Sequence, residues 1–265
     1  MKRRDFFPAA GAAAVLPAFG FSPRTNKEYN ESPGDYLELI RYRLSTGARK
    51  TAVRDFFRDA AIPALNKMGI SPIGVFNVKF GANDPSLYVL IGHKSIESFV
   101  TLPQRILDNK DLMTAARDYM DAPMSDPAYV RIEKTLFKAF KYLPSINVPA
   151  DKMGNPSRIY EMRTYESHSL KSAMKKIEMF NEGGEIDLFK KTGLFPVFFG
   201  ETLAGTMMPN LTYMVVFNDM AERDKNWAVF AQDPGWQKIS KDPQYANTVS
   251  NITDFILTPD ACSQV

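Results

Sequence analysis

The sequence contains few of the residues from which most active sites and metal centres are built. It has one cysteine, Cys262, and two histidines, His93 and His168, among 265 residues. A single cysteine excludes an intramolecular disulfide, and these three side chains are too few for a structural zinc or iron–sulfur site. Ser-His-Asp catalysis would have to use one of the two histidines, and we expect neither to be catalytic. The sequence therefore predicts no metal and no cofactor.

Short motifs that mark common enzyme classes are also missing. The sequence has no glycine-rich dinucleotide fingerprint, no phosphate-binding loop, no Gly-x-Ser-x-Gly turn and no His-Glu-x-x-His helix. Beyond the first 21 residues, it contains no apolar run of about 18 residues, the length that spans a bilayer. These absences favour a binding or interaction protein over an enzyme. They also predict no stable membrane insertion once the N-terminal segment is removed.

The first 20 residues have the composition of a targeting segment. Lys2-Arg3-Arg4 is followed by an apolar, alanine-rich stretch at 8–21 that is short for a membrane span. Arg3-Arg4-Asp5-Phe6-Phe7 looks like a twin-arginine export signal, and Ala18-Phe19-Gly20 has the small residues that a signal peptidase needs. We therefore predict a signal peptide at 1–20 and a periplasmic or extracellular protein. Export by the Sec route and an uncleaved signal anchor stay open as alternatives.

The charge of the chain gives no reason to expect a nucleic-acid partner. The formal net charge is +3, but Lys2, Arg3 and Arg4 all belong to the predicted signal peptide. The remaining chain is close to neutral, whereas nucleic-acid binding requires a basic surface.

The rest of the chain repeats. Residues 35–42 align with residues 158–165 at an offset of 123, which pairs Glu38 with Glu161, and Tyr88 pairs with Tyr213 at an offset of 125. We therefore predict two copies of one unit. The predicted organisation is a linker at 21–33, a first unit at 34–144, a linker at 145–156 and a second unit at 157–260.

Within each copy, the hydrophobic period changes in the order strand, helix, strand, strand, helix, strand. Apolar residues recur about every fourth position from Ala48 to Ala64 and from Leu170 to Phe180, which is typical of amphipathic helices. Pro63 and Gly183-Gly184 should kink or end these helices. The pattern predicts an α+β fold made of ferredoxin-like units. The predicted strands are 35–43, 72–80, 86–92 and 130–142 in the first copy, and 158–166, 195–203, 210–217 and 248–257 in the second.

Three segments of the second copy resemble the NIPSNAP family. They are the strand-like run 158–165, the glycine-preceded run 194–199, and the helix with Trp227 and Phe230 that is closed by Asp233-Pro234-Gly235-Trp236. The resemblance covers the whole chain after the signal, weakly in the first copy and well in the second. It implies a tandem, pseudo-dimeric α/β barrel with the two sheets packed together. Physical reasoning agrees, because two helices cover only one face of a four-stranded sheet.

Candidate site residues lie on the first strand of each copy. Alternation puts Leu37 and Leu39 on one side, and Ile40 with the polar residues on the other. If the apolar side meets the helices, the polar side faces the space between the two sheets. Either an ion pair between Glu161 and Arg163 ties the sheets together there, or the side chains line a ligand pocket. The candidate ligand-binding residues are Tyr36, Glu38, Tyr42, Glu161, Arg163 and Tyr165.

Two further clusters are interpreted as structural. Trp227, Phe230 and Trp236 have the spacing of a helix face and the turn after it, so we expect them in the core. Lys171, Lys175 and Lys176 are expected on an exposed helix face.

Three functions remain open. The first is an exported module that uses the space between the sheets to bind a small molecule or to interact. The second rests on resemblance, because related barrels include cofactor-free monooxygenases and haem-degrading proteins. A haem would need His93, His168 or a tyrosine as axial ligand, and a glutamate with a pKa raised by burial would serve as a base. The third is a structural partner for another exported protein, and a homodimer is also compatible with the sequence.

Replacement of both Arg3 and Arg4 by lysine should leave the precursor in the cytoplasm, because the Tat system reads the arginine pair. Cell fractionation and immunoblotting would measure this, with Lys2→Arg as a control that should be exported normally. Normal export of the double variant would contradict the twin-arginine assignment.

Overall fold

The computed structural model describes residues 34–44, 51–81 and 85–265. The predicted signal peptide at 1–20 and the linker at 21–33 lie outside the described residues, so export stays a prediction of the sequence. Within the described ranges, no helix combines the length and the apolar character needed to cross a membrane.

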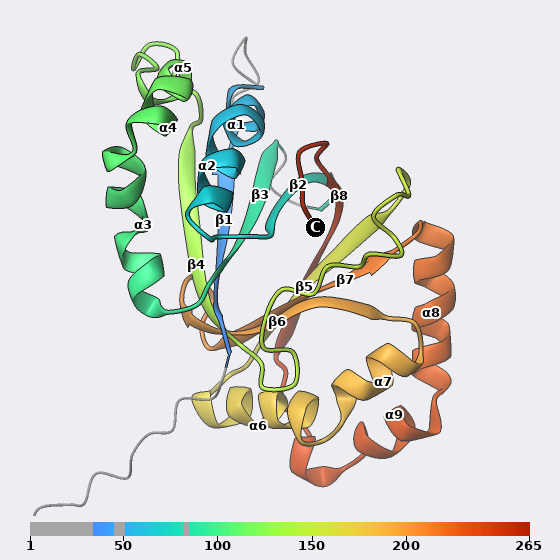
Figure 1. The fold of residues 1–265 in the computed structure, drawn as a ribbon. Helices are drawn as coiled ribbons and strands as arrows, with labels where there is room; N and C mark the ends of the chain where they lie inside the picture. Colours follow the sequence, from blue (N-terminus) through green and yellow to red (C-terminus); the bar gives the residue numbers. More distant parts are fainter. Residues whose placement is uncertain (1–33, 45–50, 82–84) are drawn as a thin grey trace, which may run out of the picture. The chain divides into compact units, whose positions relative to one another are not determined.

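The fold consists of two halves with the same order of elements (Figure 1). The predicted strands of both copies are confirmed to within a few residues. The first half contains β1 (Tyr36–Arg43), α1 (Ala52–Phe56), a π-helical turn (Phe57–Ala61), α2 (Ile62–Lys67), β2 (Ile73–Phe80), β3 (Ser86–His93), α3 (Ile96–Asp108), α4 (Lys110–Ala115), α5 (Arg117–Met120) and β4 (Arg131–Ala139). The second half contains β5 (Ile159–Glu166), α6 (Leu170–Asn181), α7 (Glu185–Lys191), β6 (Phe195–Ala204), β7 (Asn210–Phe217), α8 (Met220–Gln232), α9 (Pro234–Ile239), a 3₁₀ turn (Pro243–Tyr245) and β8 (Asn251–Pro259).

The two sheets join at their edges into one closed antiparallel barrel. Its strand order is β1-β3-β2-β8-β5-β7-β6-β4, and the junctions between the halves are β2 with β8 and β4 with β6. Each half alone would expose two edge strands with unpaired backbone groups, and pairing with the other half removes both edges. The predicted α+β fold, with two ferredoxin-like units forming a barrel within one chain, is confirmed.

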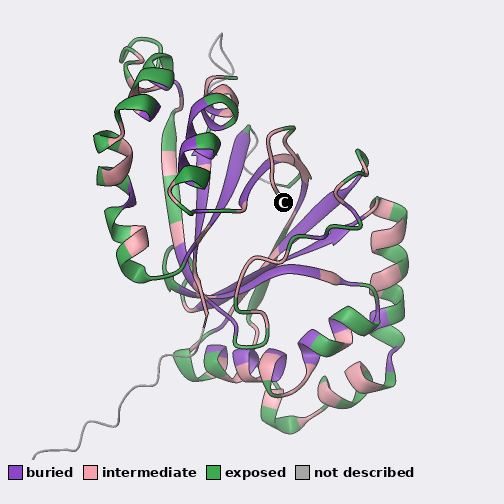
Figure 2. Ribbon diagram, viewed as in Figure 1, coloured by how far each residue is buried: buried purple, intermediate pink, exposed green. Residues whose placement is uncertain are grey.

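Large apolar side chains fill the inside of the barrel. Both halves contribute, and the strands are the most continuously buried elements of the structure (Figure 2). A closed interior of this kind excludes water, so it is stable only when apolar groups pack it densely. The interior cluster includes Leu37, Leu39, Phe76, Tyr88, Leu90, Phe137, Tyr160, Met162, Phe198, Met214 and Leu257.

The two predicted helix breaks have different outcomes. Pro63 does not end its helix, because the π-helical turn before it leads directly into α2, where proline occupies the first turn and needs no N–H donor. Gly183-Gly184 does separate α6 from α7. Gly184 adopts a left-handed φ of 84°, a conformation that glycine reaches without strain. Ala48, the first residue of the predicted helical stripe, lies outside the described residues.

One lysine predicted to be exposed is buried. Lys176 on α6 is 4% exposed and pairs with Glu185, which is 2% exposed, at 2.7 Å. Its ammonium also lies 4.5 Å from the centre of the Phe180 ring. Burial raises the pKa of Glu185, although the Lys176 charge acts in the opposite direction. The prediction from the charge pattern was wrong for Lys176, because its buried partner Glu185, nine residues along the chain, neutralises its charge.

Lys176→Met should lower the free energy of unfolding by about 3–5 kcal/mol, because it leaves Glu185 buried without its counter-ion. Lys175→Met is the matched control. Lys175 pairs with Glu178 on the solvent side of α6, and its loss should change stability far less, because water screens this pair. Urea denaturation measures both, and equal effects of the two variants would contradict a special role for the buried pair.

Candidate functional site

The structure corrects the predicted orientation of the first strands. Leu37 and Leu39 point into the barrel, whereas Glu38, Tyr42, Glu161, Arg163 and Tyr165 lie on the side that the helices cover. The alternation was read correctly, but the face was assigned the wrong way round. Apolar side chains pack the middle of the closed barrel, where a carboxylate would find no partner, while the helix layer can supply charged partners for a buried carboxylate.

Glu161 is fully enclosed by partners in the second half. Arg223 on α8 donates from Nε and Nη2 to its two carboxylate oxygens, both at 2.9 Å, and Trp227 Nε1 donates to Oε2 at 2.6 Å. Arg163, the partner predicted from the sequence, lies farther away, with Nε 3.9 Å from Oε1. The carboxylate therefore ties β5 to α8 and has little capacity left for a ligand.

Aromatic side chains occupy the rest of the space between sheet and helices in the second half. Arg163 lies 4.8 Å from the Trp227 ring centre, and the hydroxyls of Tyr165 and Tyr213 are 2.9 Å apart. The expectation that the Trp227, Phe230 and Trp236 cluster packs in the core is confirmed, although Trp227 also donates a hydrogen bond. In this half, the polar face forms an ion pair that ties the sheet to α8, and packed aromatic rings surround it. The packed rings are Phe140, Phe180, Phe189, Phe199, Tyr213 and Phe230.

Glu38 has a different set of partners in the first half. It is 1% exposed, and its Oε2 lies 3.1 Å from His93 Nε2. The Lys134 ammonium lies 2.6 Å from Oε1 and forms an ion pair with it, at an angle that is poor for a hydrogen bond. Burial acts to raise the pKa of Glu38, but the His93 hydrogen bond and the Lys134 charge outweigh it and lower the pKa. Glu38 is therefore an ionised acceptor, not the raised-pKa base that the sequence suggested.

A cavity of about 270 Å³ adjoins Glu38. It lies between the sheet and helices α1, α3 and α5, and we call it the first-half cavity. Most of its wall is apolar, and the two charged groups, Glu38 and Lys134, belong to the strands. The π-helical turn contributes the small residue Ala61 to this wall. Its main lining residues are Glu38, Tyr42, Phe56, Phe57, Leu102, Tyr119, Tyr129 and Lys134.

Three tyrosines give the first-half cavity neutral polar groups. Tyr129 packs edge-on against Tyr42, with ring centres 5.6 Å apart, and Tyr119 stacks on Phe56 at 4.0 Å. Burial raises the pKa of both Tyr42 and Tyr119, and a hydrogen bond joins the two side chains. Their phenols therefore keep their protons at neutral pH.

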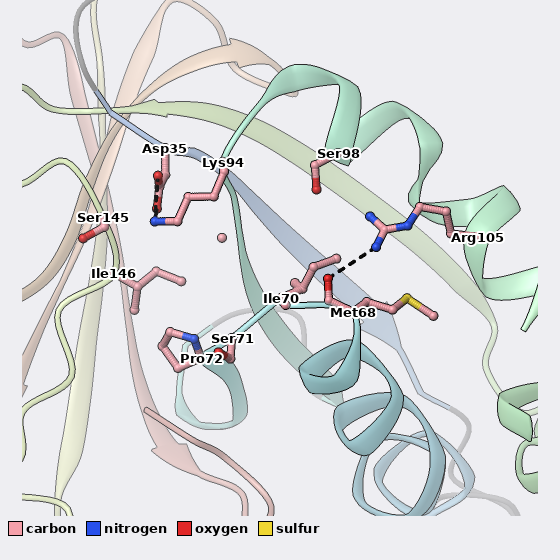
Figure 3. Close-up of a pocket in the computed structure, with 12 residues that line it drawn as sticks. Asp35, Met68, Ile70, Ser71, Pro72, Lys94, Ser98, Arg105, Ser145 and Ile146 are labelled. Carbon is pink, nitrogen blue, oxygen red and sulfur yellow. Dashed lines mark hydrogen bonds and ion pairs between the residues drawn. The ribbon is translucent and has the colours of Figure 1, made fainter.

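A second cavity, of about 320 Å³, lies where the loops after α2 and β4 meet the start of α3 (Figure 3). We call it the loop cavity. Lys94 pairs with Asp35 at 2.9 Å, Arg105 Nη2 donates to the Met68 carbonyl at 3.4 Å, and Ser98 on α3 lies between these two cations. The loop cavity is more polar than the first-half cavity.

The space between the sheets keeps one hollow, of about 230 Å³, at an end of the barrel. Its lining includes Met162, Phe255 and a pair of threonines, Thr164 and Thr212, whose hydroxyls are 2.8 Å apart. None of the six predicted site residues belongs to its lining. Tyr36, the remaining member of that set, packs under the Lys138 ammonium at 4.1 Å.

Two of the six predicted site residues, Glu38 and Tyr42, therefore line the first-half cavity, but the sequence did not predict most of their neighbours. His93, Ser98, Tyr119 and Lys134 come from β3, α3, α5 and β4, so no local spacing joins them to Glu38. The predicted pairing of Tyr88 with Tyr213 was wrong, because Tyr88 packs inside the barrel and Tyr213 packs on the helix side. The N-caps Ser95 and Asp219 give an offset of 124 for α3 and α8, which pairs Arg223 with Phe99 and Trp227 with Pro103. Among the described residues, no group of three or more His, Cys, Asp or Glu side chains is placed to hold a metal ion.

Comparison with known proteins finds a family match within the second half. Residues 160–264 match the NIPSNAP family model. The resemblance noted from residues 158–165 and the Trp227 helix is thus confirmed for the NIPSNAP-like half. No curated protein matches the chain.

Solved structures share the complete barrel. A proposed monooxygenase from Lactobacillus acidophilus superposes with a TM-score of 0.54 at 7% identity, covering 85% of this chain and 94% of its own. Another from Fusobacterium nucleatum gives 0.53 at 9% identity, covering 85% and 92%. A NIPSNAP-like domain protein from Burkholderia xenovorans gives 0.37 at 20% identity, covering 42% of this chain and 91% of its own. At these identities, the two longer matches show that the barrel fold is shared.

Glu161→Gln should lower the free energy of unfolding by about 3–5 kcal/mol, because Arg223 and Arg163 lose a buried counter-ion. Glu38→Gln should cost less, about 1–2 kcal/mol, since Lys134 is 43% exposed and can turn toward water. Urea denaturation of the two variants checks the order. Equal losses would contradict the distinction between a locked carboxylate and one that adjoins a cavity.

Proposed function

We propose that the protein binds a small, mainly apolar molecule with a hydrogen-bond donor group in the first-half cavity. The observation that carries this proposal is the state of Glu38 Oε1. It is buried, it belongs to an ionised carboxylate, and the partner that it has within the described residues is the half-exposed Lys134 ammonium, poorly aligned for a hydrogen bond at 2.6 Å. A donor group on a ligand would satisfy this oxygen, and hydrogen bonds to charged groups are among the stronger ones in proteins.

The walls of the first-half cavity define the rest of the ligand. Phe56, Phe57, Leu102 and Ile106 offer apolar contact, and the tyrosine rings add flat faces. Its volume of about 270 Å³ is close to the lower end of ligand pockets, roughly 300 Å³. The shape and chemistry therefore suit a compact aromatic alcohol or enol better than a long lipid or a charged metabolite.

Acid–base chemistry on the bound molecule is a second candidate function. Two solved barrels with the same fold are proposed monooxygenases, so the fold is compatible with an enzyme. For this chain, the specific observation is that Glu38 is hydrogen-bonded to the imidazole of His93, a group that can itself gain or lose a proton.

Binding can be tested with 2-naphthol and 2-methoxynaphthalene, two fluorescent probes that differ in the hydroxyl hydrogen. Wild-type protein should bind 2-naphthol about tenfold more tightly, equal to roughly 1.4 kcal/mol, because the hydroxyl donates to Glu38. Glu38→Gln should reduce this preference to less than about threefold, since a neutral amide oxygen is a weaker acceptor. Fluorescence titration measures the four dissociation constants.

Two controls sharpen the experiment. Glu182→Gln makes the same chemical change at a half-exposed residue of the second half, paired with Lys141, and should leave the preference intact. Ala61→Leu should weaken both probes equally, because it fills the cavity without touching the carboxylate. Failure of the wild type to bind either probe, or a full preference in Glu38→Gln, would contradict the proposal.

A further inference from the structure

A chain of three side chains runs between the first-half cavity and the loop cavity. Glu38, at one end, lines the first-half cavity, and Ser98, at the other end, lines the loop cavity. His93 lies between them, with Nε2 3.1 Å from Glu38 Oε2 and Nδ1 3.1 Å from Ser98 Oγ. His93 is 0% exposed, so its imidazole reaches neither cavity directly. Hydrogen bonds therefore connect two separate cavities through a buried histidine.

The protonation states within this chain follow from its chemistry. An ionised carboxylate only accepts hydrogen bonds, so His93 Nε2 must carry the hydrogen that faces Glu38. In the neutral imidazole, Nδ1 is then an acceptor, and the Ser98 hydroxyl donates to it. Every hydrogen bond in the chain has the same direction, from Ser98 toward Glu38. In this arrangement a proton can pass from Ser98 to Glu38 by exchange of covalent and hydrogen bonds, and the opposite tautomer of His93 allows the opposite direction.

The same three residue types also form nucleophilic triads, but the burial of His93 argues against that role. In a triad, the imidazole that activates the serine must also give its proton to the leaving group of the substrate. His93 is enclosed and its polar contacts are Ser98 and Glu38, so a substrate in the loop cavity would touch the serine alone. Transfer of a proton between the two ends requires no such access.

The second half provides an internal comparison. On α8, the helix equivalent to α3, Arg223 holds Glu161 with a guanidinium that does not release its proton in proteins. The first half joins its glutamate to the equivalent helix through two groups that can exchange protons. Both arrangements attach the helix to the sheet, but only the one in the first half can move a proton.

We propose that Glu38, His93 and Ser98 form a proton relay, and that the ligands of the first-half cavity are molecules that exchange a proton, such as phenols, enols and enolisable ketones. The proposal rests on the proposed function, because it requires a ligand beside Glu38. A ligand that approaches Oε1 displaces the Lys134 ammonium, whose charge makes Glu38 a weaker base. Binding therefore makes Glu38 a better proton acceptor at the moment when a donor is present.

The proton steps balance without any further reactant. A C–H or O–H bond of the ligand breaks, its electron pair stays on the ligand, and the proton goes to Glu38. Outward transfer uses the tautomer of His93 that carries its hydrogen on Nδ1. Its Nε2 accepts the proton from Glu38, its Nδ1 gives a proton to Ser98 Oγ, and the proton of Ser98 passes to water in the loop cavity. This leaves the Nε2–H tautomer described above, which carries a proton back from water through Ser98 and His93 to Glu38 and the ligand, so the two tautomers alternate within one exchange.

Hydrogen–deuterium exchange of 2-indanone in heavy water tests the relay, because this compact ketone has acidic C–H bonds next to its carbonyl. Without a relay, Glu38 returns most of the protons that it removes, and deuterium enters the ketone only as fast as Glu38 exchanges with solvent through the first-half cavity. NMR should show exchange that depends on Glu38, and Ser98→Ala should slow it at least tenfold with unchanged binding of 2-naphthol. Ser98→Thr, which keeps the hydroxyl, should restore exchange to within about threefold of wild type.

Ser145→Ala is the matched control, because it removes a hydroxyl from the wall of the loop cavity that is outside the relay, and it should leave exchange unchanged. If exchange requires Glu38 but is equally fast in Ser98→Ala, the relay is wrong. If 2-naphthol binds but no Glu38-dependent exchange occurs, the proton-exchanging ligand class is wrong as well. If 2-naphthol does not bind at all, the failure lies with the proposed function, so the two ideas are separated.

Discussion

A buried carboxylate on the first strand of each half determines how the helices are attached to the barrel. Glu38 and Glu161 are both at most 1% exposed, and an ionised carboxylate at that depth costs several kcal/mol unless positive or hydrogen-donating groups surround it. The helix that follows the third strand of each half provides those groups, directly from Arg223 and Trp227 and indirectly from Ser98 through His93. Neutralising the carboxylate thus fixes the position of that helix over the sheet.

The two halves satisfy this constraint in ways that leave different room for function. In the second half, a guanidinium and an indole saturate the carboxylate, and packed aromatic rings fill the surrounding space. In the first half, a histidine holds one oxygen, and the other is held by a half-exposed lysine that can turn away into water. The carboxylate also adjoins a cavity. The fold can tolerate the weaker neutralisation of Glu38, because both halves share one barrel core and the second half, with its saturated carboxylate, helps to stabilise it.

The sequence was sufficient for the strands, the repeat and the barrel, because hydrophobic period and turn residues are local signals. It was insufficient for the direction of the first strands. Alternation shows that Leu37 and Leu39 share a face, but it does not show which face meets the helices. That choice depends on closure of the barrel, a property of all eight strands. The partners of the glutamates were equally hidden, since Arg223 lies 62 residues from Glu161 and His93 lies 55 from Glu38.

Comparison of the two copies with each other would have located the site better than a search for motifs. Where the second half places Arg223 and Trp227, the first half has Phe99 and Pro103, as the common N-caps of α3 and α8 show. Each difference alone resembles neutral drift. Together they remove a fixed cation and an indole donor from one side of one glutamate, while the glutamate itself is kept in both copies. A charge retained at a buried position after its strongest partner has been replaced is difficult to explain by packing, and it is accounted for if the carboxylate meets a ligand.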